Sequence, residues 1–227
     1  MRGAGTTACA LLAASALALC QWLVFVYAPV ERSMGLAQKI FYLHLPLAWW
    51  GLASFFVVFA ASIAYLRSRK QRWDHLARAA AEVGLMLATL TLITGSVWAR
   101  HSWGVWWTWD PRLTTALVMC FIYAGYLALR GLDLPQSRKG AICAVVGIAA
   151  FLDVPLVFVS ARLWRSIHPA VFASEGGGLE PEMRLTAMVC VACFGLLWLT
   201  FTALRARQLD LAARVEDLAM ARHELDA

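Results

Sequence analysis

The chain contains six stretches of mostly apolar residues, separated by short segments that hold most of its charge. Each stretch approaches the ~20 residues that an α-helix needs to cross the hydrocarbon core of a bilayer. The stretches cover residues 8–29, 41–66, 79–99, 113–129, 141–161 and 185–204. They leave no segment for a separate soluble domain. The pattern therefore predicts an all-α integral membrane protein with six transmembrane helices.

Composition agrees with this prediction. The chain has 227 residues, of which 61% are hydrophobic and 15% charged, and its mean hydropathy is +0.65. These values lie outside the range of soluble globular domains.

The first stretch also resembles a secretory signal peptide, and residues 17–20 resemble a lipoprotein cleavage site. Its apolar run continues to Tyr27, which is too long for a signal peptide. We therefore expect a retained first helix.

Lysine and arginine predict the orientation, because cytoplasmic connections of membrane proteins carry an excess of both. With the N-terminus inside, the cytoplasmic segments hold thirteen of the 20 basic residues and the other side holds seven. We therefore expect both termini inside, with the connection between the third and fourth helices outside. The net charge of +6 follows from this topology and gives no reason to invoke nucleic acid.

We divide the chain into a six-helix membrane domain, residues 1–204, and a cytoplasmic helical tail, residues 205–227. In the tail, charged residues alternate with apolar residues at roughly helical spacing. This spacing is typical of a solvated helical extension, of a helix on the membrane surface or of one that docks a partner.

The outer connection after the third helix holds four tryptophans and one aspartate in eight residues, 103–110. Several indoles in one connection can cover a large flat apolar ligand, of which haem is the obvious candidate. If the segment is helical, Trp103, Trp106, Trp107 and Asp110 share one face. The alternative is an interfacial aromatic belt, but belts usually spread their tryptophans over several helix ends.

Three of the five histidines are on the predicted outer side: His44, His101 and His168. His44 lies just inside the second helix, where an ionisable side chain is a functional candidate. The alternative is a neutral histidine bonded to a neighbouring helix. Haem iron accepts one imidazole on each side of the porphyrin. His44 and His168 from separate helix ends could therefore clamp one haem, with His101 as the competing ligand.

Two charged residues next to the tryptophan segment are further candidates for contact with the ligand. Arg112 adjoins that segment, and a guanidinium suits a haem propionate. Asp110 followed by Pro111 has the form of a helix N-cap, which is compatible with ligand contact. Within the fifth helix we expect Asp153 to pair with a polar group near a turn loosened by Pro155.

The six cysteines all lie within predicted helices, so disulfides between outer connections are not expected. Cys190 and Cys193 have CxxC spacing, but Phe194 rather than histidine follows, so they do not form a haem-attachment motif. We interpret them as small helix-packing residues. The chain has no GxxxxGK[ST] nucleotide-binding loop. We therefore expect no enzyme activity, and any ATP hydrolysis would come from partners.

Several of these motifs, in this order, resemble the CcmC family, the haem-handling membrane subunits of the bacterial cytochrome c maturation system. They are 38–44 leading into the second helix, 94–96 at the end of the third, the segment 103–110, and His168 after the fifth. The tryptophan motif alone identifies a broader haem-handling superfamily. Arg112-Leu113-Thr114 and the absence of large outer domains favour CcmC.

The resemblance implies a site and partners. His44 and His168 would be axial ligands of a non-covalent b-type haem at the periplasmic face of the bacterial inner membrane. Trp103, Trp106, Trp107 and Trp109, with Asp110 and Arg112, would hold the porphyrin. The family delivers haem to the periplasmic chaperone CcmE, assisted by CcmD and a CcmA/CcmB ATPase complex.

Two other functions compete with haem delivery. A b-type electron carrier of a quinone oxidoreductase would normally place its histidines deep in the helices, whereas these lie near one surface. A solute transporter would be expected to have broken helices in matching halves, and the sequence has no such internal symmetry.

Overall fold

The computed structural model describes residues 3–164, 166–168 and 179–226, and these are helical apart from short connections. Six helical segments are long and apolar enough to cross a membrane: Thr7–Tyr27, Leu36–Ser68, Gln71–Trp103, Pro111–Leu129, Gln136–Ser160 and Pro181–His223. The prediction of six transmembrane helices is therefore confirmed. The helices form because only intrachain hydrogen bonds can satisfy a backbone in lipid.

The helices begin and end as follows. The first is α1 (Gly3–Trp22), prolonged by a π-helical turn (Leu23–Tyr27). A 3₁₀ turn (Leu36–Ile40) leads into α2 (Phe41–Ser68). Next come α3 (Gln71–Trp103) and α4 (Pro111–Leu129). The fifth span consists of α5 (Gln136–Ala150) and α6 (Asp153–Leu163), and α7 runs from Pro181 to Asp226.

The fifth span is broken between α5 and α6, next to Pro155, where a loosened turn was expected. A proline is tolerated there because it lies in the first turn of α6, where its missing N–H is not needed. Asp153 is buried at the start of α6, but its Oδ2 has no hydrogen-bond partner in the described part of the chain. For that oxygen the expected polar pairing is absent from the described residues.

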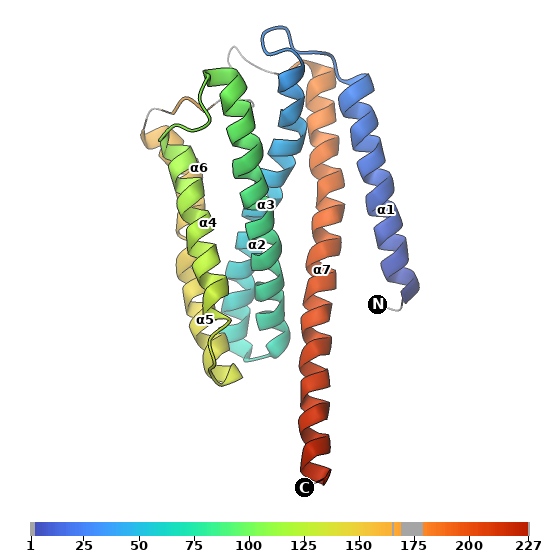
Figure 1. The fold of residues 1–227 in the computed structure, drawn as a ribbon, viewed down its shortest axis with the longest axis vertical. Helices are drawn as coiled ribbons and strands as arrows, with labels where there is room; N and C mark the ends of the chain where they lie inside the picture. The colour runs from blue at the N-terminus through green and yellow to red at the C-terminus, as the bar shows by residue number, and fades with distance from the viewer. Residues whose placement is uncertain (1–2, 165, 169–178, 227) are drawn as a thin grey trace.

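The bundle has α2 and α3 at its centre (Figure 1). On one side α7 packs against both of them and against α1, and on the other side lie α4, α5 and α6. Between α2 and α4, Phe55 stacks on Tyr123 with ring centroids 3.6 Å apart. On the α7 side, Trp50 stacks on Trp198 at 4.8 Å.

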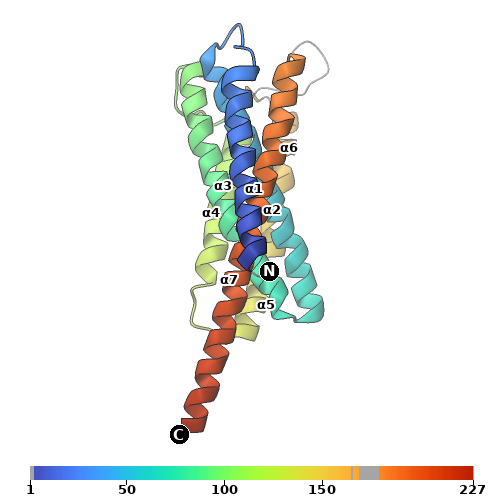
Figure 2. The same cartoon turned by 90° about the vertical axis from the view of Figure 1, so that its right-hand side faces the viewer.

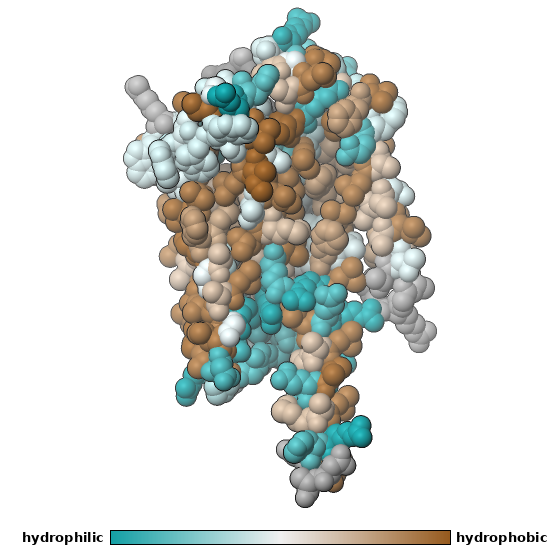
Figure 3. Space-filling view, viewed as in Figure 1, coloured by the Kyte–Doolittle hydropathy of each residue, from teal (hydrophilic) through white to brown (hydrophobic). Residues whose placement is uncertain are grey.

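The last helix continues well beyond the others (Figure 2). It is unbroken for 46 residues. The boundary that we placed at residue 205, between the membrane domain and the tail, therefore coincides with no break in the helix. Arg205 pairs with Glu82 of α3, and Asp210 lies 3.7 Å from the His75 ring. Beyond these contacts the helix leaves the bundle. Figure 3 shows a largely apolar middle, with hydrophilic residues toward both ends, including the end from which α7 projects.

One end of the bundle collects the residues singled out from the sequence. α2 and α4 begin there, and α3 and α6 end there (Figure 1). We call it the loop end, because it carries the connection 104–110. The two chain termini point toward the opposite end, as an even number of spans requires.

Candidate functional site

His44 lies on the first turn of α2, half-buried against α3. Its Nδ1 is 3.0 Å from the Thr94 hydroxyl, and its ring meets the Trp98 indole edge-on with centroids 5.8 Å apart. Gly95 provides the space for the imidazole, since a Cβ at that position would lie 2.9 Å from His44 Cε1. Real Cβ contacts are essentially never that short. The His44 imidazole is therefore seated in a notch of α3.

The segment 166–168, which carries His168, is held by Asp110. The Asp110 carboxylate accepts hydrogen bonds from the Ser166 hydroxyl at 3.0 Å and from the Ile167 N–H at 2.9 Å. The Ser166 hydroxyl in turn accepts from the His168 N–H at 3.1 Å. One buried carboxylate thus joins the tryptophan connection to a segment 56 residues further along the chain.

Asp110 is also the N-cap of α4, as its sequence context predicted. It accepts from the Arg112 N–H at 2.9 Å, and Pro111 occupies the first helical position. Burial raises the pKa of Asp110, but hydrogen bonds from Ile167, Ser166 and Arg112 outweigh that effect. The pKa therefore lies below its ordinary value, and the carboxylate is charged at neutral pH.

Arg112 contacts His168 directly. One guanidinium nitrogen of Arg112 lies 3.1 Å from Nδ1 of the imidazole. His44 and His168 are also close enough to interact electrostatically. The structure thus brings four of the residues predicted for the site to the loop end: His44, His168, Asp110 and Arg112.

The tryptophan segment differs from one expectation. α3 ends at Trp103, because Gly104 adopts a left-handed backbone conformation (φ 75°), and residues 104–110 are not helical. The helical face proposed for Trp103, Trp106, Trp107 and Asp110 is therefore wrong. The Ser96 hydroxyl instead ties the connection to α3 by donating to the Trp106 carbonyl at 2.7 Å.

Three of the four indoles line an open groove of about 570 Å³ between α3 and α4. This volume lies within the 300–1,000 Å³ typical of ligand pockets. Its lining is almost wholly apolar: Leu92, Ile93, Ser96, Val97, Trp106, Trp107, Trp109 and Leu117. Trp103 is not among the lining residues, and Arg100 lies over the Trp106 ring, 6.0 Å from its centroid. The groove has the size and character for a flat apolar ligand.

The groove and the His44 notch occupy opposite faces of α3. At 100° per residue, Thr94, Gly95 and Trp98 point to one side of the helix, and Ile93, Ser96 and Val97 to the other. Three predicted porphyrin-holding indoles and one predicted iron ligand are therefore separated by the width of a helix in this conformation.

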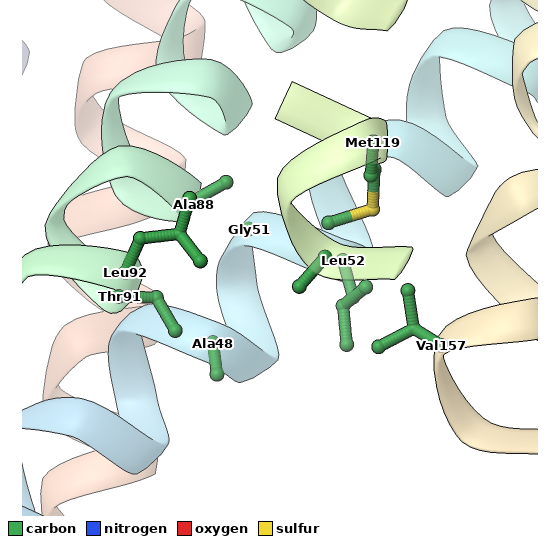
Figure 4. Close-up of a pocket in the computed structure, with 9 residues that line it drawn as sticks. Ala48, Gly51, Leu52, Ala88, Thr91, Leu92, Met119 and Val157 are labelled. Atoms are coloured by element: carbon green, nitrogen blue, oxygen red, sulfur yellow. The ribbon is translucent and has the colours of Figure 1, made fainter. Parts of the chain in front are cut away.

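Two other features are less suited to a porphyrin. His101, the competing ligand, is exposed on the last turn of α3. A small apolar cavity lies between α2, α3, α4 and α6, lined by residues that include Ala48, Thr91 and Met119 (Figure 4). Its volume of about 60 Å³ is too small for a tetrapyrrole.

The family model described as "Heme exporter protein C" (CcmC) matches residues 1–221. The chain belongs to the CcmC family. It therefore acts in haem export for cytochrome c biogenesis as a multi-pass membrane protein.

Curated relatives agree with this assignment. Heme exporter protein C of Bradyrhizobium diazoefficiens is 34% identical over 196 residues, covering 85% of this chain and 74% of the relative. Its counterpart in Rhodobacter capsulatus is 30% identical over 221 residues, covering 92% and 88%. A ccmC-like mitochondrial protein of cytochrome c biosynthesis from Marchantia polymorpha is 27% identical over 205 residues, covering 90% and 86%. These relatives are named for export or biosynthesis, not for catalysis.

Membership of the CcmC family does not by itself explain which residues build the notch. Thr94 and Gly95 stood out in the sequence only as part of a motif, and Trp98 did not stand out at all. Ser166 likewise gave no signal of its own. Each of these residues acts through a contact with a segment that is distant in the sequence. The only signal for it in the sequence was that it lies near a residue whose chemistry had already singled it out.

Proposed function

We infer that the chain binds haem between His44 and His168 at the periplasmic face of the bacterial inner membrane and passes it to the chaperone CcmE. The haem is a b-type haem, held without covalent bonds. The chain has no enzyme activity of its own, and CcmA/CcmB supply ATP hydrolysis while CcmD assists. The observation that carries this proposal is that His44, at the start of α2, and His168, on the segment held by Asp110, come from separate elements to the same end of the bundle.

Donor chemistry supports haem as the cargo. Two imidazoles can supply the axial ligands that haem iron accepts. Arg112, beside His168, supplies a guanidinium suited to a carboxylate. The Trp98 indole N–H next to His44 is buried without an acceptor in the described part of the chain. An unsatisfied buried donor is destabilising, so an acceptor brought by a ligand would stabilise this site.

The tryptophan connection holds the porphyrin in this proposal. Trp106, Trp107 and Trp109 line the groove on the far side of α3, so the connection repositions when haem is clamped. Gly104 provides a hinge, since its positive φ marks the end of α3. Asp110 keeps the other end of the connection fixed at the start of α4.

Absorption spectra of purified protein loaded with haem test the proposal. Wild type should show the low-spin spectrum of bis-imidazole haem. His44→Ala and His168→Ala should each convert it to a high-spin spectrum, whereas His101→Ala should leave it unchanged. A low-spin spectrum that survives both of the first two substitutions would overturn the assignment of ligands.

Delivery requires a separate measurement. Haem-loaded wild type mixed with purified CcmE should transfer its haem, and covalent attachment to CcmE can be followed by haem staining of a denaturing gel. The His168→Ala variant, which binds haem less tightly, should transfer less. Equal transfer by free haem in the absence of the chain would contradict a delivery role.

A further inference from the structure

The two imidazoles of the site are held in opposite tautomers, which follows from the groups facing their Nδ1 atoms. The Thr94 hydroxyl has one hydrogen, and it donates to the Leu90 carbonyl at 2.8 Å. Toward His44 Nδ1, 3.0 Å away, it therefore accepts. His44 then carries its proton on Nδ1, and the lone pair of Nε2 is available to bind iron.

At His168 the roles are reversed. The Arg112 guanidinium, 3.1 Å from Nδ1, has only N–H donors and no acceptor. Nδ1 of a neutral His168 must therefore accept, and the ring proton resides on Nε2. Neither nitrogen has a lone pair available for iron: one is occupied by the guanidinium and the other is protonated.

Asp110 holds the segment that carries His168 as well as the start of α4, so the imidazole and the Arg112 guanidinium face each other. Asp110 fixes both partners, because it accepts from the Arg112 N–H as well as from Ser166 and Ile167. The imidazole is released when the guanidinium, on its flexible side chain, exchanges it for another partner.

We propose that Arg112 is a latch, which keeps His168 unable to bind iron until a carboxylate of the incoming tetrapyrrole draws the guanidinium away. When Arg112 pairs with that carboxylate, Nδ1 gains a proton and Nε2 loses one, so the net charge of the ring is unchanged and Nε2 becomes a ligand. His44 binds iron first and His168 second. The chain then selects iron tetrapyrroles with free carboxylates. This inference rests on the proposed function.

The test compares haem with its dimethyl ester, in which both carboxylates are blocked. The full-length protein is purified in detergent and titrated with each compound, and the low-spin fraction is measured by absorbance. In wild type the ester should give a low-spin fraction roughly tenfold or more below that of haem, which is the loss of one charge-assisted hydrogen bond. In Arg112→Ala the two compounds should give equal fractions.

The matched control is Arg184→Ala, an exposed arginine on the first turn of α7, which should retain the wild-type preference for haem. An ester that is fully low-spin in wild type would overturn the latch, as would an Arg112→Ala variant that still rejects the ester. Neither result affects the bis-imidazole assignment. Failure of haem itself to become low-spin in wild type would instead refute the proposed function.

A second measurement needs no substitution at Arg112. In ¹⁵N spectra of histidine-labelled protein without haem, protonated and bare ring nitrogens have well-separated shifts. We expect one ring protonated on Nδ1 and one on Nε2 for the pair, with the Nε2 form assigned to His168 from its loss in His168→Ala. A His168 signal with the proton on Nδ1 would overturn the latch even if Arg112→Ala failed to fold.

Discussion

His44 and His168 share a chemistry but are held by different kinds of structure. His44 is positioned by helix packing, because Gly95 leaves a notch in α3 that the imidazole fills. His168 is positioned by a polar network, in which one carboxylate holds a short segment that is not helical. The difference teaches that the two histidines should respond to different substitutions: His44 to added volume, and His168 to lost hydrogen bonds.

The largest effect should come from filling the notch. Gly95→Leu would place a Cβ 2.9 Å from His44 Cε1, so the imidazole must leave its seat. We expect loss of the low-spin haem spectrum and a destabilisation of about 1–3 kcal/mol, measured by thermal unfolding.

Gly125→Leu is the matched control, because a Cβ on Gly125 of α4 meets nothing within 4 Å. It should retain the wild-type spectrum. If Gly95→Leu did so as well, His44 would not depend on the notch and the contrast between the two histidines would fail.

A smaller effect is expected at Asp110, where two substitutions separate its two roles. Asp110→Ala removes the N-cap of α4, at a cost of about 0.5–2 kcal/mol, together with the bonds to Ser166 and Ile167. Asp110→Asn keeps a capping oxygen but offers one acceptor atom in place of two.

The two Asp110 variants should therefore differ in how far they change thermal stability and the haem spectrum. Asparagine should retain most of the stability while losing part of the low-spin fraction, whereas alanine should lose both. If both variants bound haem as wild type does, the polar network would not be what positions His168.

The smallest effect sharpens the comparison at His44. Thr94→Val keeps the volume of the side chain and removes the oxygen that accepts from Nδ1. Loss of one hydrogen bond corresponds to about 1 kcal/mol, so haem affinity measured by titration should fall several-fold. Thr94→Ser restores the hydroxyl and should restore affinity. Equal weakening by serine would show that the methyl group matters and not the oxygen.

Much of this fold could be predicted because lipid restricts the choices. Hydropathy located the six spans, and the Asp110-Pro111 pair located the start of α4. The helical reading of 103–110 failed because periodicity took no account of Gly104, whose left-handed conformation ends α3. Spacing alone could not decide between a helix and an irregular connection.

The site was predictable only in its parts. His44, His168, Asp110 and Arg112 were singled out from their own chemistry, but the contacts that they make join segments 50 to 56 residues apart and were not predicted. Arg112 was interpreted only as a partner for propionate. Its contact with Nδ1 of His168 depends on how α4 and the end of α6 meet, which no local pattern encodes.

The length of α7 has a mechanical consequence. Its 46 residues correspond to about 69 Å at 1.5 Å per residue, more than twice the ~30 Å of hydrocarbon. A continuous helix has no hinge at the membrane boundary that could absorb a force applied to its free end. Tilting its free end would shift Trp198, and through it Trp50, which stacks on Trp198 and lies on the same helix as His44. The free end of α7 is therefore connected through one aromatic stack to the helix that carries His44.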